Sequence, residues 1–482
     1  MKTIHHSPVE KVIELFVSII SGCPDVKTIN NRLVPDRLAA AAWCQRQFAE
    51  QSQVSEVLHR ITPETLLQLE DVFQELFARQ SLSRRHSPAE WLVVDVDMTG
   101  LVVSPTSKSY EGAAFGFMQK DKGKGYKLSC PYIGDPFAEV LGGLFDPGSA
   151  HCSTKLAELL LLIEKRVGSP PGSLEAYRNR IQQWESKADT LERRSLQREQ
   201  EASKAYKPQR KNLLEQRADK LHNRAKLLRD EVSQALHMAN AFQSIRDRNP
   251  FRGILIRGDA GFGAIENIIL LSELKYDFLL KGYSPHTAAL LAKEVPSKQW
   301  LEFTPVVSVA ELGPVNLPGC PYPLRVVLGK TKTAKLGVEQ YFHLITTIPK
   351  RMKDARTLLR FYNARQTIEA FIKTGKNVLN FKHFRVRNFY GIQFTLVLSL
   401  LAHNFMSWAR RNIFAGTPLA KIGIREFVEQ AMRVPARADI HMAPLRSQIQ
   451  VTLFPETNVY ARSLVEAIKR KQSLQLPLPF ME

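Results

Sequence analysis

An unbroken apolar run at Trp91–Thr99 is the feature that most restricts the fold of this 482-residue chain. The run reads Trp-Leu-Val-Val-Asp-Val-Asp-Met-Thr, without glycine or proline. It is typical of a strand buried on both faces, as in the central strands of α/β sheets. Asp95 and Asp97 project from the same face of this strand. Each buried carboxylate needs a partner, because an unpaired buried charge costs several kcal/mol.

A second short apolar strand is predicted at residues 253–258, and it ends at Asp259 in a glycine-rich turn. Open α/β sheets place their functional sites at such strand ends. Asp-Ala-Gly also suits an ordinary turn, so this carboxylate alone has a purely structural alternative. Two strands therefore contribute candidate acidic residues.

A polar stripe follows near residue 369. Tyr362, Arg365, Glu369 and Lys376 stand at offsets of 0, 3, 7 and 14, which places them within about a 60° arc of one helix. A solvated face of an amphipathic helix is the ordinary interpretation of such a stripe. The functional alternative is a carboxylate for a divalent cation, flanked by cations for phosphate oxygens. Together with the two aspartates, Glu369 would complete an oxygen-ligand site for Mg²⁺.

These motifs resemble the DDE transposases of bacterial insertion sequences whose third carboxylate lies in a Tyr-x2-Arg-x3-Glu-x6-Lys helix. The resemblance rests on Asp97 in Asp-Val-Asp-Met-Thr, on Asp259 in Ile-Arg-Gly-Asp-Ala-Gly-Phe and on the polar stripe, and the segment Tyr110–Phe117 is also similar to one branch of these enzymes. In that family Thr stands two residues after the first Asp, which favours Asp97 over Asp95. The resemblance covers roughly residues 85–412.

The resemblance implies an α/β fold with an RNase H-like (retroviral-integrase-like) catalytic core, a helical insertion, a β-rich insertion and an N-terminal helical domain. It further implies that Asp97, Asp259 and Glu369 are catalytic and hold two Mg²⁺ ions, with Mn²⁺ as a substitute. The activity would be cleavage at transposon ends and strand transfer into target DNA, with a homodimer pairing the ends. A nuclease without strand transfer, or an inactive DNA-binding relative, remains an alternative.

The charge of the chain agrees with a polyanionic partner. Lys and Arg number 67 against 47 Asp and Glu, a formal net charge of +20. The apolar stretch 390–409 is interrupted by polar residues and closed by Arg410-Arg411, so a packed core helix is favoured over a membrane span. His403 within it is expected to be a hydrogen-bonded core residue. Five cysteines without zinc spacing suggest free thiols in a reducing, cytoplasmic compartment. The resemblance further implies a nucleoid-associated protein without a membrane partner.

The expected organisation has seven parts. They are an N-terminal helical, possibly DNA-binding domain at 1–85; core segments at 86–172, 249–275 and 351–412; a helical hairpin insertion at 173–248; a β-rich insertion at 276–350; and a C-terminal region at 413–482. In the first part, helices are predicted at 38–48 and 63–77. The β-rich part should contain strands at 276–282, 303–312, 324–330 and 340–348, separated by prolines.

Three segments carry candidate contacts to nucleic acid. Residues 381–390 interleave basic and aromatic side chains, so Lys382, Arg385 and Arg387, together with Tyr362, Arg365 and Lys376, are predicted to contact DNA phosphates. Trp300, Tyr341 and Phe342 are candidates for stacking on a base, but core packing is the favoured role. The helical insertion could lie along a duplex or dimerise. Its modest basic surplus favours a hairpin with ordinary solvated faces.

Overall fold

The computed structural model describes residues 6–83, 91–118, 121–168, 170, 173–246, 253–332, 339–382, 384–434, 436–441, 448–453 and 459–472. The chain forms two compact units. The first comprises Met1–His86, Val94–Lys155 and Phe361–Glu482, and the second comprises Ser87–Val93 and Leu156–Arg360. Each unit contains helices and a β-sheet, so the protein is a mixed α/β protein, as predicted.

The sheet of the first unit is built on β1 (Leu92–Val102), which passes from the second unit into the first after Val93. Strand β3 (Lys122–Ile133) pairs with β1 antiparallel and sets Cys130 opposite Asp97. Strand β2 (Ala114–Phe117) forms a hairpin with β3, and the short strands β4 (Glu139–Val140) and β5 (Leu144–Pro147) pair with β3 as well. The predicted strand at residues 91–99 is confirmed, and Val94, Asp95 and Val96 are completely buried.

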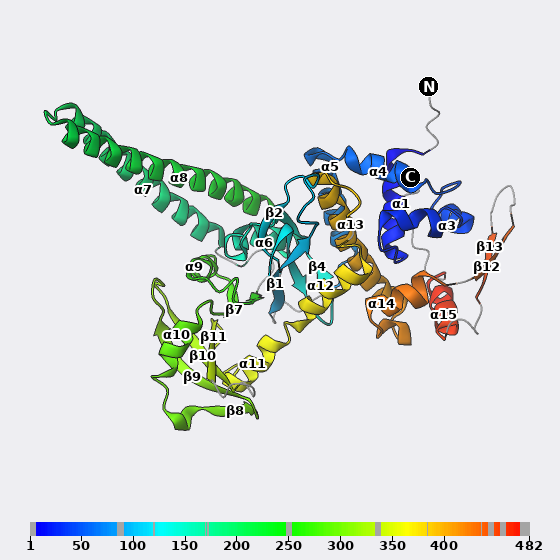
Figure 1. Cartoon of the computed structure of the whole chain (residues 1–482). Helices are drawn as coiled ribbons and strands as arrows, with labels where there is room; N and C mark the ends of the chain where they lie inside the picture. Colours follow the sequence, from blue (N-terminus) through cyan, green and yellow to red (C-terminus); the bar gives the residue numbers. More distant parts are fainter. Residues whose placement is uncertain are drawn as a thin grey trace. The chain divides into compact units, whose positions relative to one another are not determined.

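Helices α12 (Gln366–Val378) and α13 (Phe389–Trp408) pack against this sheet (Figure 1). Phe371 of α12 stacks on Tyr132 of β3 with ring centroids 4.9 Å apart. Helix α13 continues into a π-helical turn, and the whole stretch to Ile413 is long and apolar enough to span a membrane. Most of it is buried within the unit, and His403 Nε2 lies 3.1 Å from Ala138 O. The predictions of a packed core helix and a hydrogen-bonded core histidine are therefore confirmed.

Three N-terminal helices contact α13: α1 (Pro8–Ile20), α4 (Gln51–His59) and α5 (Pro63–Gln80). The short helices α2 (Ile29–Arg32) and α3 (Arg37–Ala42) stand between α1 and α4 in the sequence. The predicted helix at 38–48 is wrong in extent, because α3 ends at Ala42 and Cys44 adopts a left-handed conformation with φ of 58°. Gln45 N then donates to Ala40 O, which closes the helix end without the glycine that usually marks it.

The rest of the first unit follows α13 in the sequence. It contains α14 (Ile424–Phe427), the two-stranded antiparallel pair β12 (Ala436–His441) and β13 (Gln448–Leu453), and α15 (Ala461–Gln472).

The sheet of the second unit is mixed. Strands β6 (Ile254–Gly258) and β7 (Asp277–Lys281) are parallel and are connected by α9 (Ile265–Glu273). Strand β11 (Glu339–Thr346) pairs antiparallel with β7, and β10 (Pro323–Lys332), β9 (Val307–Asn316) and β8 (Leu301–Thr304) extend the sheet in that order. Helix α10 (Pro285–Ala292) contacts β11.

The strands predicted at 276–282, 324–330 and 340–348 are confirmed. The one predicted at 303–312 is wrong in extent. The chain turns at Pro305-Val306 and separates β8 from β9, since proline cannot donate a hydrogen bond to a ladder.

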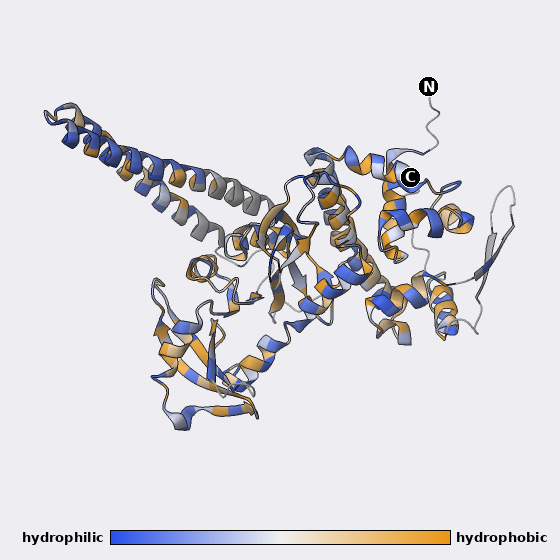
Figure 2. Ribbon diagram, viewed as in Figure 1, coloured by the Kyte–Doolittle hydropathy of each residue, from blue (hydrophilic) through white to orange (hydrophobic). Residues whose placement is uncertain are grey.

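A long helical hairpin also belongs to the second unit. Helices α7 (Ser173–Ser203) and α8 (Pro208–Arg246) lie side by side along their lengths (Figure 1), and α8 contacts α6 (Leu156–Val167). Their described residues are mainly hydrophilic, with scattered apolar side chains (Figure 2). A helical hairpin, as predicted within residues 173–248, is therefore present.

Candidate active site

Alternate residues of β1 face α12 and define the candidate site. Asp95, Asp97 and Thr99 share one face of the strand, and each of them is contacted by a side chain from residues 365–376. Asp95 is fully buried, and Thr367 Oγ1 lies 3.5 Å from its Oδ2. The side chain of Asp97 is 15% exposed. Of the two aspartates, Asp97 is therefore the more exposed.

The polar stripe lies on two helices, not on the single helix that its spacing predicts. Helix α11 (Ala355–Asn363) ends after Tyr362, and Glu369 and Lys376 belong to α12. Between them the hydrogen bonds tighten to three-residue spacing: Arg365 N donates to Tyr362 O, and Ile368 N donates to Arg365 O. The single-helix prediction is therefore wrong at Ala364 and Arg365, while the four-residue spacing of Arg365 and Glu369 is preserved.

Arg365 joins the strand carboxylate to the helix carboxylate. Its NH1 lies 3.3 Å from Asp97 Oδ2, and its NH2 donates to Glu369 Oε1 at 2.6 Å. The guanidinium group is only 10% exposed, whereas the Glu369 side chain is 56% exposed. Without this cation, two carboxylates would face one another, and each would disfavour ionisation of the other. Two acidic side chains separated by 272 positions thus meet at one cation.

Lys376 approaches the same strand from the other end of α12. Its Nζ donates to Thr99 Oγ1 at 2.6 Å and to Gly100 O at 3.0 Å. The pKa of Lys376 is lowered to about 8, mainly by burial and also by the charges of Lys382 and Lys127, while Asp97 opposes the shift. Holding the Lys376 ammonium in the site therefore removes part of its hydration, which disfavours the charged form.

Thr99, Thr367 and Lys127 were not among the predicted site residues. The two-residue alternation from Asp97 could have indicated Thr99, because every second residue of a strand shares a face. Lys127 is 8% exposed and donates to Phe117 O, and burial lowers its pKa. No sequence pattern marks this lysine, because it becomes a neighbour of Lys376 only through the β1–β3 pairing.

Asp259 belongs to the second unit and stands directly after β6, as predicted from its glycine-rich turn. Its Oδ1 accepts a hydrogen bond from Gly261 N at 3.0 Å, and its carbonyl accepts one from Phe262 N. This is the turn geometry that Asp-Ala-Gly favours. The Asp259 side chain is half-buried.

Three of the six predicted phosphate-contacting residues lie in the segment between α12 and α13. Lys382, Arg385 and Arg387 are exposed, while Phe381 is fully buried. Arg385 forms an ion pair with Asp25 at 2.7 Å, Arg387 NH1 donates to Ser109 Oγ, and Lys382 Nζ donates to Asn377. In this segment the three basic side chains are therefore at the surface, while the Phe381 ring is packed in the core. Its contact with DNA remains a prediction.

The three stacking candidates gather on the second-unit sheet. The rings of Trp300 and Tyr341 are 6.2 Å apart, and Lys330 Nζ lies 4.8 Å from the Trp300 centroid. Phe342 lies across from Gly329 on β10, with Lys281 Nζ 5.5 Å from its centroid. All three rings are partly exposed, so none of them is completely packed in the core. Stacking on a base stays a prediction.

Comparison with protein families decides the class of the chain. The family model described as transposase DDE domain group 1 matches residues 221–474, more than half of the sequence. The chain belongs to the DDE transposases. The matched residues of this transposase include Asp259 and Glu369, while Asp97 lies before them. No curated protein matches the chain.

Membership of the DDE transposases implies DNA substrates and divalent metal ions as the general cofactors of the enzyme. In the part of the chain that the structure describes, no three His, Cys, Asp or Glu side chains cluster closely enough to hold a metal. The donor set of the first unit nevertheless suits a hard cation, because Asp97 and Glu369 present carboxylate oxygens to one shared positive charge.

Proposed function

We propose that this transposase cleaves DNA at transposon ends and joins the freed ends to target DNA, using Asp97, Asp259 and Glu369 in an RNase H-like core. The observation that carries the proposal is the meeting of Asp97 and Glu369 at Arg365. A cation already occupies the place between these carboxylates, so a divalent ion there would replace one compensating charge by another. Asp259 is proposed to join them from the second unit.

The proposed cofactor is a pair of Mg²⁺ ions, or Mn²⁺ in their place, held by the three carboxylates. When bound, the ions would activate the attacking hydroxyl group and stabilise the leaving oxygen. Glu369 is suited to bind them because its side chain is more than half exposed. The half-buried Asp97 is oriented by the pairing of β1 with β3 and by its ion pair with Arg365.

The cations of α12 are proposed to bind the phosphate groups of the DNA end. Arg365 can turn its guanidinium from the carboxylates to phosphate oxygens once the carboxylates have another positive partner. Lys376 places an ammonium beside Asp97, and its hydrogen bonds to Thr99 and Gly100 restrict its motion. Tyr362 is proposed to donate to a neighbouring phosphate, and Lys382, Arg385 and Arg387 to follow the backbone further along.

Pairing two ends requires two active sites, so we propose a homodimer in the end complex, acting on the bacterial nucleoid. The duplicated site would allow both ends to be cut and joined together. The same carboxylates would serve both reactions, because only the attacking group changes between water and a 3′-hydroxyl.

The test uses the purified chain and duplexes made from the DNA that flanks its reading frame. Asp97→Asn, Asp259→Asn and Glu369→Gln should each lower Mg²⁺-dependent cleavage by at least about 100-fold while end binding persists. Asp95→Asn is the matched control, since Asp95 lies on the same strand face, and it should retain cleavage. Undiminished cutting by any of the three variants would remove that residue from the site.

A second assay separates transposition from simple hydrolysis. Precut ends with a free 3′-hydroxyl should be joined to a target plasmid by the wild type in Mg²⁺. Cleavage of the flanking duplex without any joining would instead identify a nuclease.

A further inference from the structure

The helical hairpin of the second unit is held by a narrow seam of small residues. Ala188, Ser195 and Ala202 recur every seven residues on α7, and Ala218 and Ala225 do so on α8; all five are buried. Ser195 Oγ donates to Ala218 O at 2.9 Å and links the helices directly. Seven-residue spacing keeps one stripe of each helix against its neighbour. Because the seam side chains are short, the side chains that flank it on both helices come close together.

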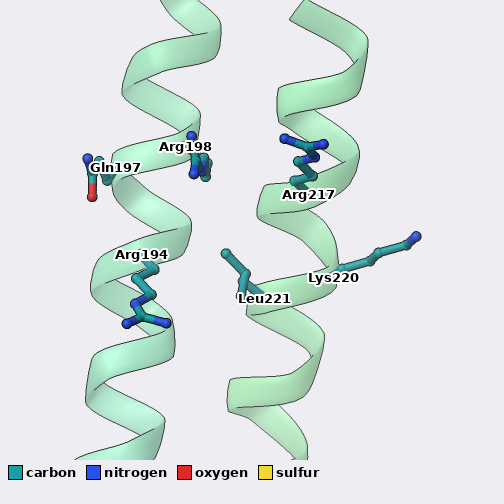
Figure 3. A pocket seen from close by; sticks show the side chains of 6 residues that line it. All are labelled: Arg194, Gln197, Arg198, Arg217, Lys220 and Leu221. Atoms are coloured by element: carbon teal, nitrogen blue, oxygen red, sulfur yellow. The ribbon is translucent and has the colours of Figure 1, made fainter.

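Flanking side chains near the tip of the hairpin enclose an open pocket of about 490 Å³. Arg194, Gln197 and Arg198 line it from α7, and Arg217, Lys220 and Leu221 line it from α8 (Figure 3). Leu221 extends toward α7, whereas Lys220 extends outward. Three arginines thus border one depression, Lys220 stands at its rim, and the Gln197 amide is beside them as a hydrogen-bond donor.

Charges on the hairpin are compensated differently at its two ends. Nearer the base, Arg229 NH2 bridges to Asp189 at 2.5 Å and to Glu192 at 3.1 Å across the helices. At the pocket, Arg198 pairs with Glu201 within α7. Among the residues that the structure describes, no carboxylate forms an ion pair with Arg194, Arg217 or Lys220. The pocket therefore gathers like charges that repel one another until an anion binds.

The positive charge continues along α8. Arg210, Arg217 and Arg224 are exposed and stand seven residues apart, so they recur on one side of the helix at intervals of about 10 Å. Residues 190–224 contain ten Lys and Arg against five Asp and Glu. A row of this kind fits a linear polyanion, whose charges also repeat along an axis, better than it fits a single small anion.

We propose that the hairpin is a second DNA-binding surface, in which the pocket between α7 and α8 holds backbone phosphates of a duplex independently of its sequence. Arginine guanidinium groups bind phosphate oxygens in pairs of hydrogen bonds, and the stiff seam keeps those groups in register. The inference rests on the DNA substrates that family membership implies. It does not depend on the three-carboxylate site.

The test compares two double variants of the full chain. Arg194→Gln with Arg217→Gln removes one pocket cation from each helix. Arg193→Gln with Lys226→Gln removes the same charge from exposed positions of the same helices that do not line the pocket. Affinity for a labelled 30-bp duplex of arbitrary sequence is measured by anisotropy over a range of KCl concentrations.

The pocket variant should lose about tenfold or more in affinity near 100 mM salt, and its salt slope should fall by about 1.8, because each lost phosphate contact contributes about 0.9. The control should stay within about twofold of the wild type. Arg194→Lys with Arg217→Lys keeps the charge and should recover most of the affinity, which separates charge loss from misfolding.

Equal losses in the pocket variant and the control would overturn the proposal. So would unchanged DNA affinity with an altered oligomeric state by light scattering, which would assign this surface to a second copy of the chain through exposed residues such as Leu213 and Leu227. Asp97→Asn should bind the duplex with the wild-type salt slope. Failure of the catalytic proposal would therefore not alter this result.

Discussion

At the scale of single residues, Arg365 explains how acidic side chains can be held together before any metal binds. Its guanidinium pairs with one oxygen of Asp97 and one of Glu369, and the Arg365 side chain itself is largely shielded from water. Such a pair is stabilising mainly in comparison with the unpaired charges that its loss would leave. The arginine thus bridges the two carboxylates, and we propose that it also binds a phosphate group once a metal ion is present.

Lys376 leads to a prediction about pH. Its pKa of about 8 means that the ammonium form, which can neutralise phosphate, predominates at pH 7 and is the minority at pH 9. Arginine at this position stays charged over that range. The second-order rate of end cleavage by the wild type, divided by that of Lys376→Arg, should therefore fall about tenfold between pH 7 and pH 9.

Dividing the wild-type rate by the Lys376→Arg rate removes the effect of pH on the attacking group, because both proteins use the same attacking group. Lys298→Arg, at an exposed position of the second unit, serves as the control and should follow the wild type. Parallel pH profiles for the wild type and Lys376→Arg would show that this ammonium does not titrate in the step measured.

At the scale of elements, the stripe illustrates what spacing can and cannot predict. The periodicity placed Arg365, Glu369 and Lys376 on one face, and in the structure Arg365 and Lys376 contact β1 while Glu369 pairs with Arg365. It could not predict the tightened turn at Ala364 and Arg365, because no glycine or proline marks it. The turn forms where Arg365 is drawn toward Asp97, which is a tertiary contact.

Other boundaries follow the same rule. The interruption between β8 and β9 falls at Pro305, which local chemistry can explain once the turn is known. The end of α3 requires a left-handed Cys44, a conformation that is uncommon outside glycine and asparagine. The β8–β9 boundary thus has a local explanation in Pro305, whereas the end of α3 depends on packing more than on helix propensity.

Gly375 allows α12 to be tested as an element. A Cβ atom there would lie 2.3 Å from the ring of Phe381, which is fully buried and packs against Phe371. Gly375→Ala should therefore lower the free energy of unfolding by about 1–3 kcal/mol, although alanine is the better helix former. Denaturant unfolding measures this change, and end cleavage should fall as well because Lys376 moves with the helix.

The matched control is Gly423→Ala. Nothing lies within 4 Å of the Cβ atom added there, so its effect should remain below about 1 kcal/mol, the scale of a helix-cap change. A Gly375→Ala protein as stable as the wild type would show that Phe381 can yield, and α12 would then be less tightly positioned than we infer.

At the scale of the whole molecule, the transposase family and the mixed α/β class were both predictable from a few motifs. The net charge of +20 agreed with a nucleic-acid substrate but could not locate the contact surface. The pocket of the hairpin illustrates the reason, since its cations come from two helices and become neighbours only through the alanine seam. A count of charges along the segment indicated only a modest surplus.

The three carboxylates are divided between the two units, with Asp97 and Glu369 in the first and Asp259 in the second. We propose that all three bind the same metal ions, and this proposal is the central claim. It predicts that metal binding should depend on each of the three carboxylates, because a shared ion is bound much more weakly when one of its ligands is neutralised.

Calorimetric titration of Mn²⁺ into the full chain tests this claim most directly, since it needs neither a transposon end nor catalysis. Asp259→Asn should weaken Mn²⁺ binding by about tenfold or more, as Asp97→Asn and Glu369→Gln should. Wild-type Mn²⁺ affinity in Asp259→Asn, with binding lost in the other two variants, would contradict the claim and leave a two-carboxylate site confined to the first unit.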